Sequence, residues 1–238
     1  WRLNQLGHQV TVYERSDRFG GLLMYGIPNM KLDKDVVQRR IDLMADLGVR
    51  FIGNTEIGRD ISADELAAQY DRIILSTGAS VPRDLTIPGR ALTGVQFAVD
   101  YLTEATKDVL KHGKEATSKK LTGKHVVVIG GGDTGNDCIG TAVRQGAASV
   151  RQLEITPQPP LQRAATNPWP EYPLTARTGY GQEEAAEVFQ SQVTYHGVST
   201  TAFIGAERGQ LIALETVSVD DRFQPIAGTK EVIKADLV

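Results

Sequence analysis

The sequence of 238 residues has little of several features that would define a function at once. Its one cysteine, Cys138, excludes an internal disulfide, a Cys-x-x-Cys redox pair and an iron–sulfur cluster ligated within these residues. Four scattered histidines have no metal-ligand spacing, so no metal site is predicted. The net charge of −3 and the absence of long apolar runs argue against nucleic acid and membranes as partners.

The composition that remains is typical of a globular protein, with 41 % hydrophobic and 23 % charged residues. The 24 glycines fall between strand-like and helix-like segments, an alternation that favours an α/β fold. There is no signal peptide and no initiator methionine. The chain opens in mid-pattern at Trp1 and stops at what looks like the start of a buried strand, so we expect it to be a piece of a longer protein.

Hydrophobic periodicity predicts the order of the elements. Six of the ten prolines lie in segment 157–173, which predicts a long irregular loop, and the Pro- and Gly-containing segment 82–94 is the expected crossing between two units. A capping box at Ser62 and Glu65 opens one helix. Strands are expected at 10–14, 49–52, 72–76, 126–129, 150–155, 192–196, 211–220 and 231–237, and helices at 33–47, 62–70, 96–110, 136–145 and 181–190.

The sharpest motif is Gly-x-Gly-x-x-Gly at Gly130, Gly132 and Gly135, between a strand and a helix in a strand–turn–helix–strand unit. Gly130 permits a tight turn, Gly132 lets the backbone approach a pyrophosphate, and Gly135 allows the helix to pack closely on the strand. The helix start then holds the phosphate charge with its free amides. This context predicts a dinucleotide site, although a glycine-rich turn without a ligand remains the alternative.

The residue that selects the nucleotide is expected at the end of the second strand, where Glu154 stands 24 residues after Gly130. A carboxylate there accepts hydrogen bonds from ribose hydroxyls and repels a 2′-phosphate, which favours NAD over NADP. Arg163, in the Pro-rich loop, is either a solvated loop residue or a cation that binds a 2′-phosphate. Asp133 either orients the ligand together with Thr134 or caps its helix. We interpret Cys138 as a small buried hydrophobe.

The first 79 residues look like a second dinucleotide fold without its first strand. Glu14 ends the predicted strand 10–14, where a ribose-binding carboxylate belongs. From the residues alone, Glu14 is equally a surface residue at a strand end, and Gly20 with Gly21 is equally a plain turn.

Several motifs along the whole chain resemble the small (β) subunit of glutamate synthase, and more distantly the flavin portion of dihydropyrimidine dehydrogenase. They are Glu14-Arg15, Gly20-Gly21-Leu22-Leu23, Tyr25-Gly26-Ile27-Pro28, Lys31-Leu32, Leu75-Ser76-Thr77-Gly78-Ala79, Gly130-Gly131-Gly132-Asp133-Thr134-Gly135-Asn136-Asp137-Cys138 and Asn167-Pro168-Trp169-Pro170-Glu171-Tyr172-Pro173.

The resemblance implies a Rossmann-like NAD(P)-binding domain inserted in a partial FAD-binding Rossmann-like domain. Residues 1–92 would be the FAD-binding part, lacking its first glycine-rich strand–turn–helix. Residues 93–238 would be the NAD(P)H-binding domain with a strand returning towards the FAD domain. It implies FAD contacts by Glu14, Gly21, Leu22, Lys31, Ile57 and Ala79, and nucleotide contacts by Gly130, Gly131, Gly132, Asp133, Thr134, Gly135 and Glu154.

The implied function is that of a cytoplasmic flavoprotein oxidoreductase in nitrogen assimilation. A hydride passes from NADH or NADPH to FAD, and electrons continue through iron–sulfur clusters in the parent's N-terminal region to the large subunit. That partner makes glutamate from glutamine and 2-oxoglutarate. We name no catalytic side chain, because the cofactors carry hydride transfer and the protein aligns them.

Three departures limit the expectation. The cysteine-rich region, the first FAD glycine loop and the segment that closes over the flavin are missing, so we expect incomplete FAD binding and no activity from the fragment alone. NADP-using relatives have a basic pair at the positions of Ile155 and Thr156. Two alternatives stay open, namely a flavin reductase with another acceptor, as in pyrimidine-reducing or ferredoxin-linked enzymes, and a nucleotide-binding redox sensor without turnover.

Overall fold

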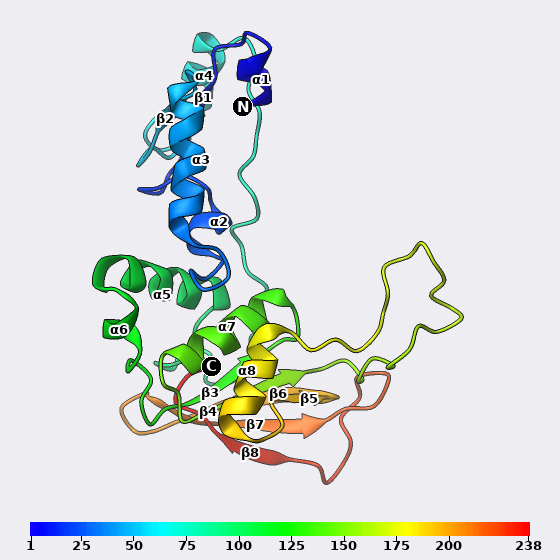
Figure 1. Ribbon diagram of the computed structural model, residues 1–238. Helices are drawn as coiled ribbons and strands as arrows, with labels where there is room; N and C mark the ends of the chain where they lie inside the picture. Colours follow the sequence, from blue (N-terminus) through cyan, green and yellow to red (C-terminus); the bar gives the residue numbers. More distant parts are fainter. The chain divides into compact units, whose positions relative to one another are not determined.

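The computed structural model describes all 238 residues. The chain divides into two compact units, Trp1–Pro82 and Arg83–Val238, which we call unit 1 and unit 2 (Figure 1). Both contain parallel strands connected through helices, so the α/β fold class predicted from the sequence is confirmed. The assignment of an FAD-binding domain to residues 1–92 and an NAD(P)H-binding domain to residues 93–238 stays a prediction.

Unit 1 is built on two short parallel strands, β1 (Thr11–Tyr13) and β2 (Arg50–Ile52). Between them the chain forms α2 (Leu22–Tyr25) and α3 (Lys34–Asp46), while α1 (Arg2–Gln5) precedes β1 and α4 (Ala63–Gln69) follows β2. The side chain of Asp33 caps α3, and Gly48 follows the helix with a φ of +97°. The predicted capping box of Ser62 and Glu65 is present at α4.

The buried core of unit 1 is small. Its one cluster consists of Met24, Tyr25 and Val37, with Leu32 packed against them, and Val49 and Leu66 are buried outside this cluster. A buried lysine lies beside this core: the Lys34 ammonium donates to the carbonyls of Leu23, Ile27 and Leu32 at 3.0, 2.6 and 2.9 Å. Lys34 therefore joins α2, the turn after it and the start of α3 through backbone oxygens.

The prediction of a strand at 72–76 is wrong. Residues 71–84 form no helix or strand, and none of their backbone amides or carbonyls bonds to another backbone group. Ile74 and Leu75 are 68 % and 84 % exposed. The apolar run has the composition of a buried strand, but a strand forms only beside a partner, and no strand lies along this segment.

Unit 2 centres on a parallel sheet in the order β3-β4-β5, formed by His125–Ile129, Ser149–Glu154 and Thr194–His196. Helix α7 (Asp133–Arg144) connects β3 to β4, and α8 (Tyr180–Phe189) precedes β5. Residue Leu237 bridges to Val126, so the end of the chain runs parallel to β3. Helices α5 (Ala98–His112) and α6 (Lys114–Thr117) complete the helical part.

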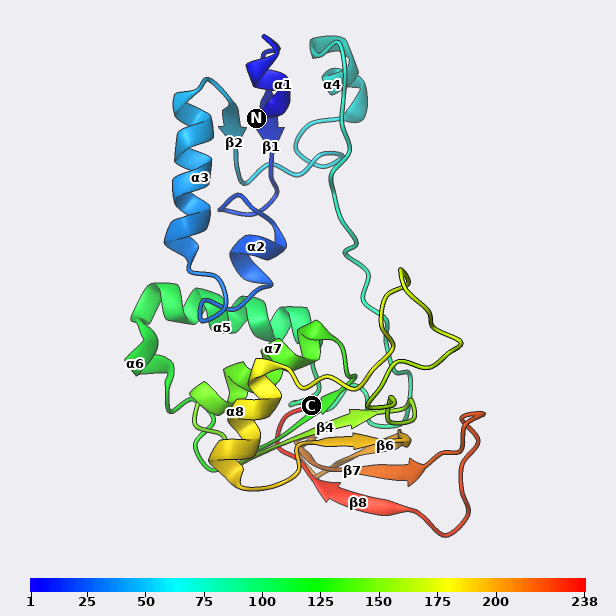
Figure 2. The same cartoon turned by 45° about the vertical axis from the view of Figure 1, so that its right-hand side comes forward.

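The two faces of this sheet are covered by different layers (Figure 2). On one face, Val126, Val128 and Val150 pack with apolar residues of α5, α7 and α8. On the other, Val127 and Leu153 pack on an antiparallel sheet of β6 (Val198–Gly205), β7 (Leu211–Ser218) and β8 (Glu231–Lys234). The sequence pattern did not predict β6. Burial on both faces explains the continuous apolar run of β3.

The segment between β4 and α8 is irregular, as its prolines predict, and extends away from the sheet in both views (Figure 1, yellow-green). It nevertheless has an internal anchor in Asn167, which is 7 % exposed. The Asn167 side chain donates to Glu171 and to the Tyr172 carbonyl, each at 3.0 Å, and accepts from the Leu174 amide at 2.9 Å. The loop is therefore ordered by its own hydrogen bonds.

Candidate nucleotide site

The glycine motif forms the turn between β3 and α7, at the carboxyl end of the central sheet. Gly130 has a φ of +114°, a conformation that residues with a Cβ rarely adopt. A Cβ at position 135 would lie 2.6 Å from the Gly130 carbonyl oxygen and 3.4 Å from Val128 Cγ1, so α7 packs directly on the turn. The glycines at 130 and 135 are thus required by the fold itself.

Gly132 differs from its two partners in the motif. It is the N-cap residue of α7 with a φ of −76°, and a Cβ there would meet no atom within 4 Å. No side chain caps the helix, so its first amides are not used by the protein. The space above Gly132 and these amides together form an arrangement suited to an anionic group.

Two polar residues follow at this helix start. Asp133 and Thr134 are exposed in the first turn of α7, within reach of the same space. Asp133 is the first helical residue and makes no capping bond, so the alternative that it caps its helix is wrong. Cys138, about one turn further along α7, belongs to the hydrophobic cluster and is buried, and burial raises the pKa of its thiol to about 12.

Glu154 ends β4 directly beside the turn. A Cβ at position 131 would overlap Glu154 Oε2, which places this carboxylate oxygen against Gly131. The other oxygen, Oε1, accepts from the Thr156 hydroxyl at 3.1 Å and the Thr156 amide at 3.3 Å. Glu154 is half-buried, and the bonds from Thr156 fix its carboxylate while Oε2 faces the glycine turn.

Sequence reasoning missed a set of buried amide side chains beneath the turn. Gln152 in β4 is fully buried and donates to the Gly130 carbonyl at 2.8 Å. Its Oε1 accepts from Gln182 at 2.6 Å and from Thr194 at 3.0 Å. Strand alternation could have predicted the position of Gln152. Residues two apart in a strand lie on the same face of the sheet, so Gln152 lies on the same face as Glu154.

Arg163 takes the role of a loop residue. Its guanidinium donates to the carbonyls of Asn167 and Glu171 at 3.0 Å each, which closes the Pro-rich loop on itself. The sequence left open whether Arg163 instead binds a 2′-phosphate, and its contacts here are those of the loop.

In unit 1 the predicted residues lie after β1, at the start of α2 and in three later segments. Glu14 follows β1, is half-buried, and accepts from the Ser16 amide at 2.9 Å through Oε1. Gly21 has a φ of +51° and precedes α2, in which Leu22 is exposed. Lys31 and Ala79 are exposed, and Ile57 is 40 % exposed with a backbone bridge to Ile61.

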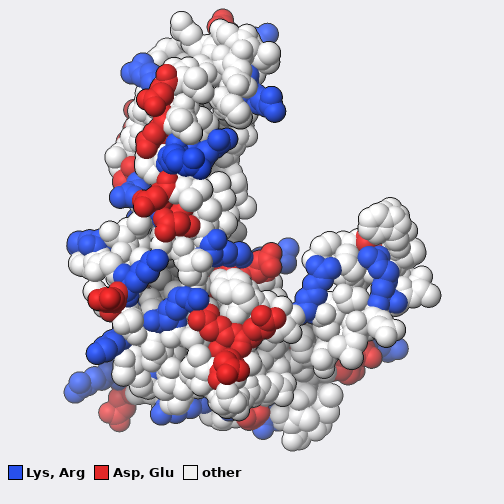
Figure 3. Space-filling model, viewed as in Figure 1, with Lys and Arg blue, Asp and Glu red and all other residues white.

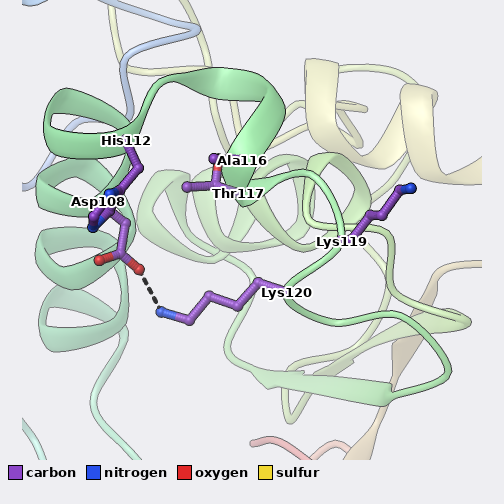
Figure 4. A pocket seen from close by; sticks show the side chains of 6 residues that line it. All are labelled: Asp108, His112, Ala116, Thr117, Lys119 and Lys120. Atoms are coloured by element: carbon purple, nitrogen blue, oxygen red, sulfur yellow. Dashed lines mark hydrogen bonds and ion pairs between the residues drawn. The ribbon is translucent and has the colours of Figure 1, made fainter.

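A hollow of about 540 Å³ lies elsewhere, between α5 and the segment after α6, and none of the predicted site residues lines it (Figure 4). Its lysine Lys120 pairs with Asp108 at 2.6 Å and with Glu104 at 2.8 Å. Burial lowers the pKa of Lys120, the two carboxylates raise it, and the net direction is upward. The charge of Lys120 is therefore already paired with carboxylates of the protein.

Other classes of site find no support in the described chain. No group of three or more histidine, cysteine or acidic side chains could hold a metal ion. None of the helices combines the length and the apolar character needed to cross a bilayer. Basic and acidic side chains both occur across the face shown in Figure 3, as the small net charge requires.

Comparison with solved structures places the fold. FprA of Mycobacterium tuberculosis, solved in complex with NADPH, matches 96 % of this chain and 62 % of its own with a TM-score of 0.64 at 20 % identity. At that identity the likeness concerns the fold alone.

Curated relatives are much closer in sequence. The chain is 47 % identical over 244 residues to "Glutamate synthase [NADH]" of Saccharomyces cerevisiae, covering 99 % of this chain and 11 % of that protein. It is also 47 % identical over 246 residues to "Glutamate synthase [NADPH] small chain" of Bacillus subtilis, covering all of this chain and 50 % of that one. The chain thus spans half or less of the length of these relatives.

The model of the family "Pyridine nucleotide-disulphide oxidoreductase" matches residues 1–169, which include β1, the glycine turn and Glu154. These are the parts that the geometry above singles out in both units. With more than half of its residues matched, and with this fold, the chain belongs to the pyridine nucleotide-disulphide oxidoreductase family.

Proposed function

We propose that this chain is part of the electron-input module of a glutamate synthase, in which a hydride passes from NAD(P)H to FAD. The observation that carries the proposal is the position of the Glu154 carboxylate against Gly131, above the uncapped start of α7. The names of the relatives from yeast and Bacillus support the choice of glutamate synthase among flavin reductases.

The residues of unit 2 fit a nicotinamide dinucleotide. The amides of Gly131, Gly132 and Asp133 would hold the pyrophosphate at the helix start, where the backbone leaves open space. Glu154 Oε2 would accept from the adenosine ribose, and Thr134 would orient the phosphates. Gly130 and Gly135 contribute by allowing the turn and the close helix.

The residues of unit 1 fit part of an FAD site. Glu14 keeps one carboxylate oxygen for a ribose hydroxyl, and Gly21 starts a helix. Leu22, Lys31, Ile57 and Ala79 would complete the contacts. The two cofactors supply the hydride donor and acceptor when bound. The protein aligns them and excludes water, and we assign no side chain a proton-transfer role.

The later steps of the proposed reaction need groups outside these 238 residues. Electrons would pass through iron–sulfur clusters outside these residues to a large subunit in the cytoplasm, which forms glutamate from glutamine and 2-oxoglutarate. Because the chain spans only part of its relatives, we expect nucleotide binding but no turnover from these 238 residues alone.

Substituting Gly132 tests the nucleotide site with little risk to the fold. Gly132→Asp places a good N-cap residue where the backbone has space and an ordinary φ. Its carboxylate competes with and repels the pyrophosphate. We expect an unchanged or higher melting temperature and at least about a tenfold loss of NADH affinity by calorimetry.

The control is Ser118→Asp, which adds the same charge at an exposed site after α6. It should leave NADH affinity unchanged. Equal NADH affinity of Gly132→Asp and the unaltered chain would reject the site, and so would failure of the unaltered chain to bind either nucleotide.

The nucleotide preference is tested separately, since relatives at 47 % identity are named for NADH and for NADPH. The carboxylate of Glu154 and the lack of a basic pair at Ile155 and Thr156 favour NADH. We expect tighter binding of NADH than of NADPH, and Glu154→Gln should reduce the ratio by about tenfold. Tighter NADPH binding by the unaltered chain would overturn the selector role of Glu154.

A further inference from the structure

We propose that Gln152 is a positioning residue for the nucleotide turn, because its buried amide fixes the peptide between Gly130 and Gly131 in the orientation that binding needs. The inference rests on the proposed nucleotide site and deepens it. Gln152 touches no ligand position itself, since it lies beneath the turn, fully buried.

The orientation of the Gln152 amide is determined by backbone groups of fixed polarity. At one end, the Gly179 amide donates to Gln182 Oε1 at 2.7 Å, so the other end of Gln182 is its donor nitrogen. That nitrogen donates to Gln152 Oε1 at 2.6 Å, and Gln152 Nε2 therefore faces the Gly130 carbonyl at 2.8 Å. A carbonyl can only accept, so the whole chain of bonds has one direction.

The hydrogen bond controls a peptide plane. In a planar trans peptide, the carbonyl of Gly130 and the amide of Gly131 point in opposite directions. Gln152 draws the Gly130 oxygen towards α7, where it lies 2.6 Å from the place of a Cβ at position 135. The Gly131 N–H is thereby directed away from the protein interior, towards the proposed phosphate position.

This peptide joins two glycines, which are the residues that resist rotation least. Without Gln152, neither neighbour has a side chain that would keep the plane from turning. A turned plane would present the Gly130 oxygen to the phosphates, and this oxygen would repel them. Gln152 therefore supplies the rigidity that the glycines cannot provide.

The same amides secure the start of α8. Asn136 Oδ1, in α7, accepts from the amides of Gly181 at 3.0 Å and Gln182 at 3.2 Å. Gln182 then extends to Gln152 and, at 3.2 Å, to Thr194 in β5. The turn is thus held by α7, α8 and two strands rather than by the loop alone.

A matched control exists in the same unit. Gln145 is also buried, at 3 % exposure, and its Oε1 accepts from the Tyr101 hydroxyl at 2.9 Å. It has no contact with residues 130–135. Gln152→Glu and Gln145→Glu make the same chemical change in similarly buried positions. If Gln152 had only a structural role, the two variants would lose the same NADH affinity for the same decrease in melting temperature.

The experiment uses the 238-residue chain, with NADH affinity and melting temperature measured at pH 8 and pH 6. In Gln152→Glu the ionised carboxylate keeps the acceptor for Gln182 but has no proton for Gly130. We expect NADH to bind at least about tenfold more weakly at pH 8 than to the unaltered chain. Protonation lets the introduced carboxyl group of this variant donate to the Gly130 carbonyl. The loss of NADH affinity relative to the unaltered chain should therefore be smaller at pH 6.

Gln145→Glu should stay within about twofold of the unaltered chain at both pH values. The inference is overturned if Gln152→Glu binds NADH like the unaltered chain, or if both variants lose affinity equally at equal melting temperature. If Gln152→Glu does not fold, Gln152→Met decides, because it removes the donor to the Gly130 carbonyl and keeps a side chain of similar length.

Gln152→Met should weaken NADH binding at least about tenfold at both pH values, and unchanged affinity would reject the positioning role. Failure of the unaltered chain to bind NADH or NADPH would instead reject the proposed function. Binding by the unaltered chain with no effect at Gln152 would reject this inference alone.

Discussion

The two units share a parallel strand pair connected through helices, but they differ in strand length and in how much of each unit is buried. In each, a parallel strand pair is connected through helices, and a carboxylate, Glu14 or Glu154, follows a strand near a glycine pair. In unit 2 the strands are five and six residues long and covered on both faces. In unit 1 they are three residues long, and the one hydrophobic cluster has three buried residues.

The difference indicates that a glycine turn is held in place by buried side chains of neighbouring elements, as Gln152 holds the Gly130 carbonyl. The Gly130 carbonyl accepts from the buried side-chain amide of Gln152 in a neighbouring strand, whereas the Gly21 carbonyl accepts only from the backbone amides of Met24 and Tyr25 in the helix that it precedes. Burial of apolar area contributes roughly 25 cal/mol per Å², and unit 1 leaves large apolar side chains such as Leu6 and Leu75 in water. We therefore expect unit 2 to be the more stable part.

Hydrogen exchange should give the largest contrast. The amides of residues 71–84 make no backbone bond and should exchange at nearly the rate of an unfolded chain. Those of β3 and β4 should exchange at least about a thousandfold more slowly. Mass spectrometry of peptic peptides measures both in one sample. Equal protection of the two regions would break the comparison.

Alkylation of Cys138 reports on unit 2 alone. Burial raises the pKa of this thiol to about 12, so at pH 8 iodoacetamide should react roughly a thousandfold more slowly than with an unstructured thiol. The raised pKa favours the neutral thiol in the folded chain. This contribution to stability is complete below the ordinary thiol pKa and is lost as the pH rises towards 12. Alkylation of Cys138 at the rate of an unstructured thiol would contradict a rigid unit 2.

Alanine substitutions compare the two turns directly. Gly135→Ala puts a methyl 2.6 Å from a backbone oxygen and should reduce the free energy of unfolding by about 2–3 kcal/mol. Gly21→Ala meets no atom and costs only backbone strain, about 1–3 kcal/mol, because φ +51° with ψ −124° lies outside the left-handed helical region. Denaturant unfolding measures both, with Gly132→Ala as the control for an open site. A larger loss at Gly21 would reverse the conclusion.

Lys34 offers the smallest effect and tests unit 1 from within. Lys34→Met keeps the length of the side chain but leaves the carbonyls of Leu23, Ile27 and Leu32 without this donor. We expect unit 1 to lose about 1–2 kcal/mol, seen as faster exchange of α3 amides. Arg39→Met, exposed on the same helix, is the control and should change nothing. Unaltered exchange in Lys34→Met would show that the bonds add no stability.

Much of the fold could be predicted because its signals are local. The capping box at Ser62, the stop at Gly48 and the strand–turn–helix–strand around Gly130 depend on residues close in sequence. The candidate residues of the turn, including Glu154, could be named for the same reason. Their roles as ligand contacts stay predictions, while their position around one turn follows from the fold.

The failures concern residues whose environment is set by distant parts of the chain. The run at 72–76 has the composition of a strand and no strand beside it. Gln152 and Lys34 look like surface residues in the sequence, yet each is buried and satisfied by partners from other elements. No local pattern could predict these pairings.

The sequence by itself determined the α/β class and the glycine turn with its carboxylate. These follow from periodicity, glycine conformations and spacing, which act over a few residues. Only the tertiary structure decided which strands form and which polar side chains are buried behind the turn. A strand needs hydrogen-bond partners and a buried amide needs a donor and an acceptor, and both come from segments that meet only when the chain folds.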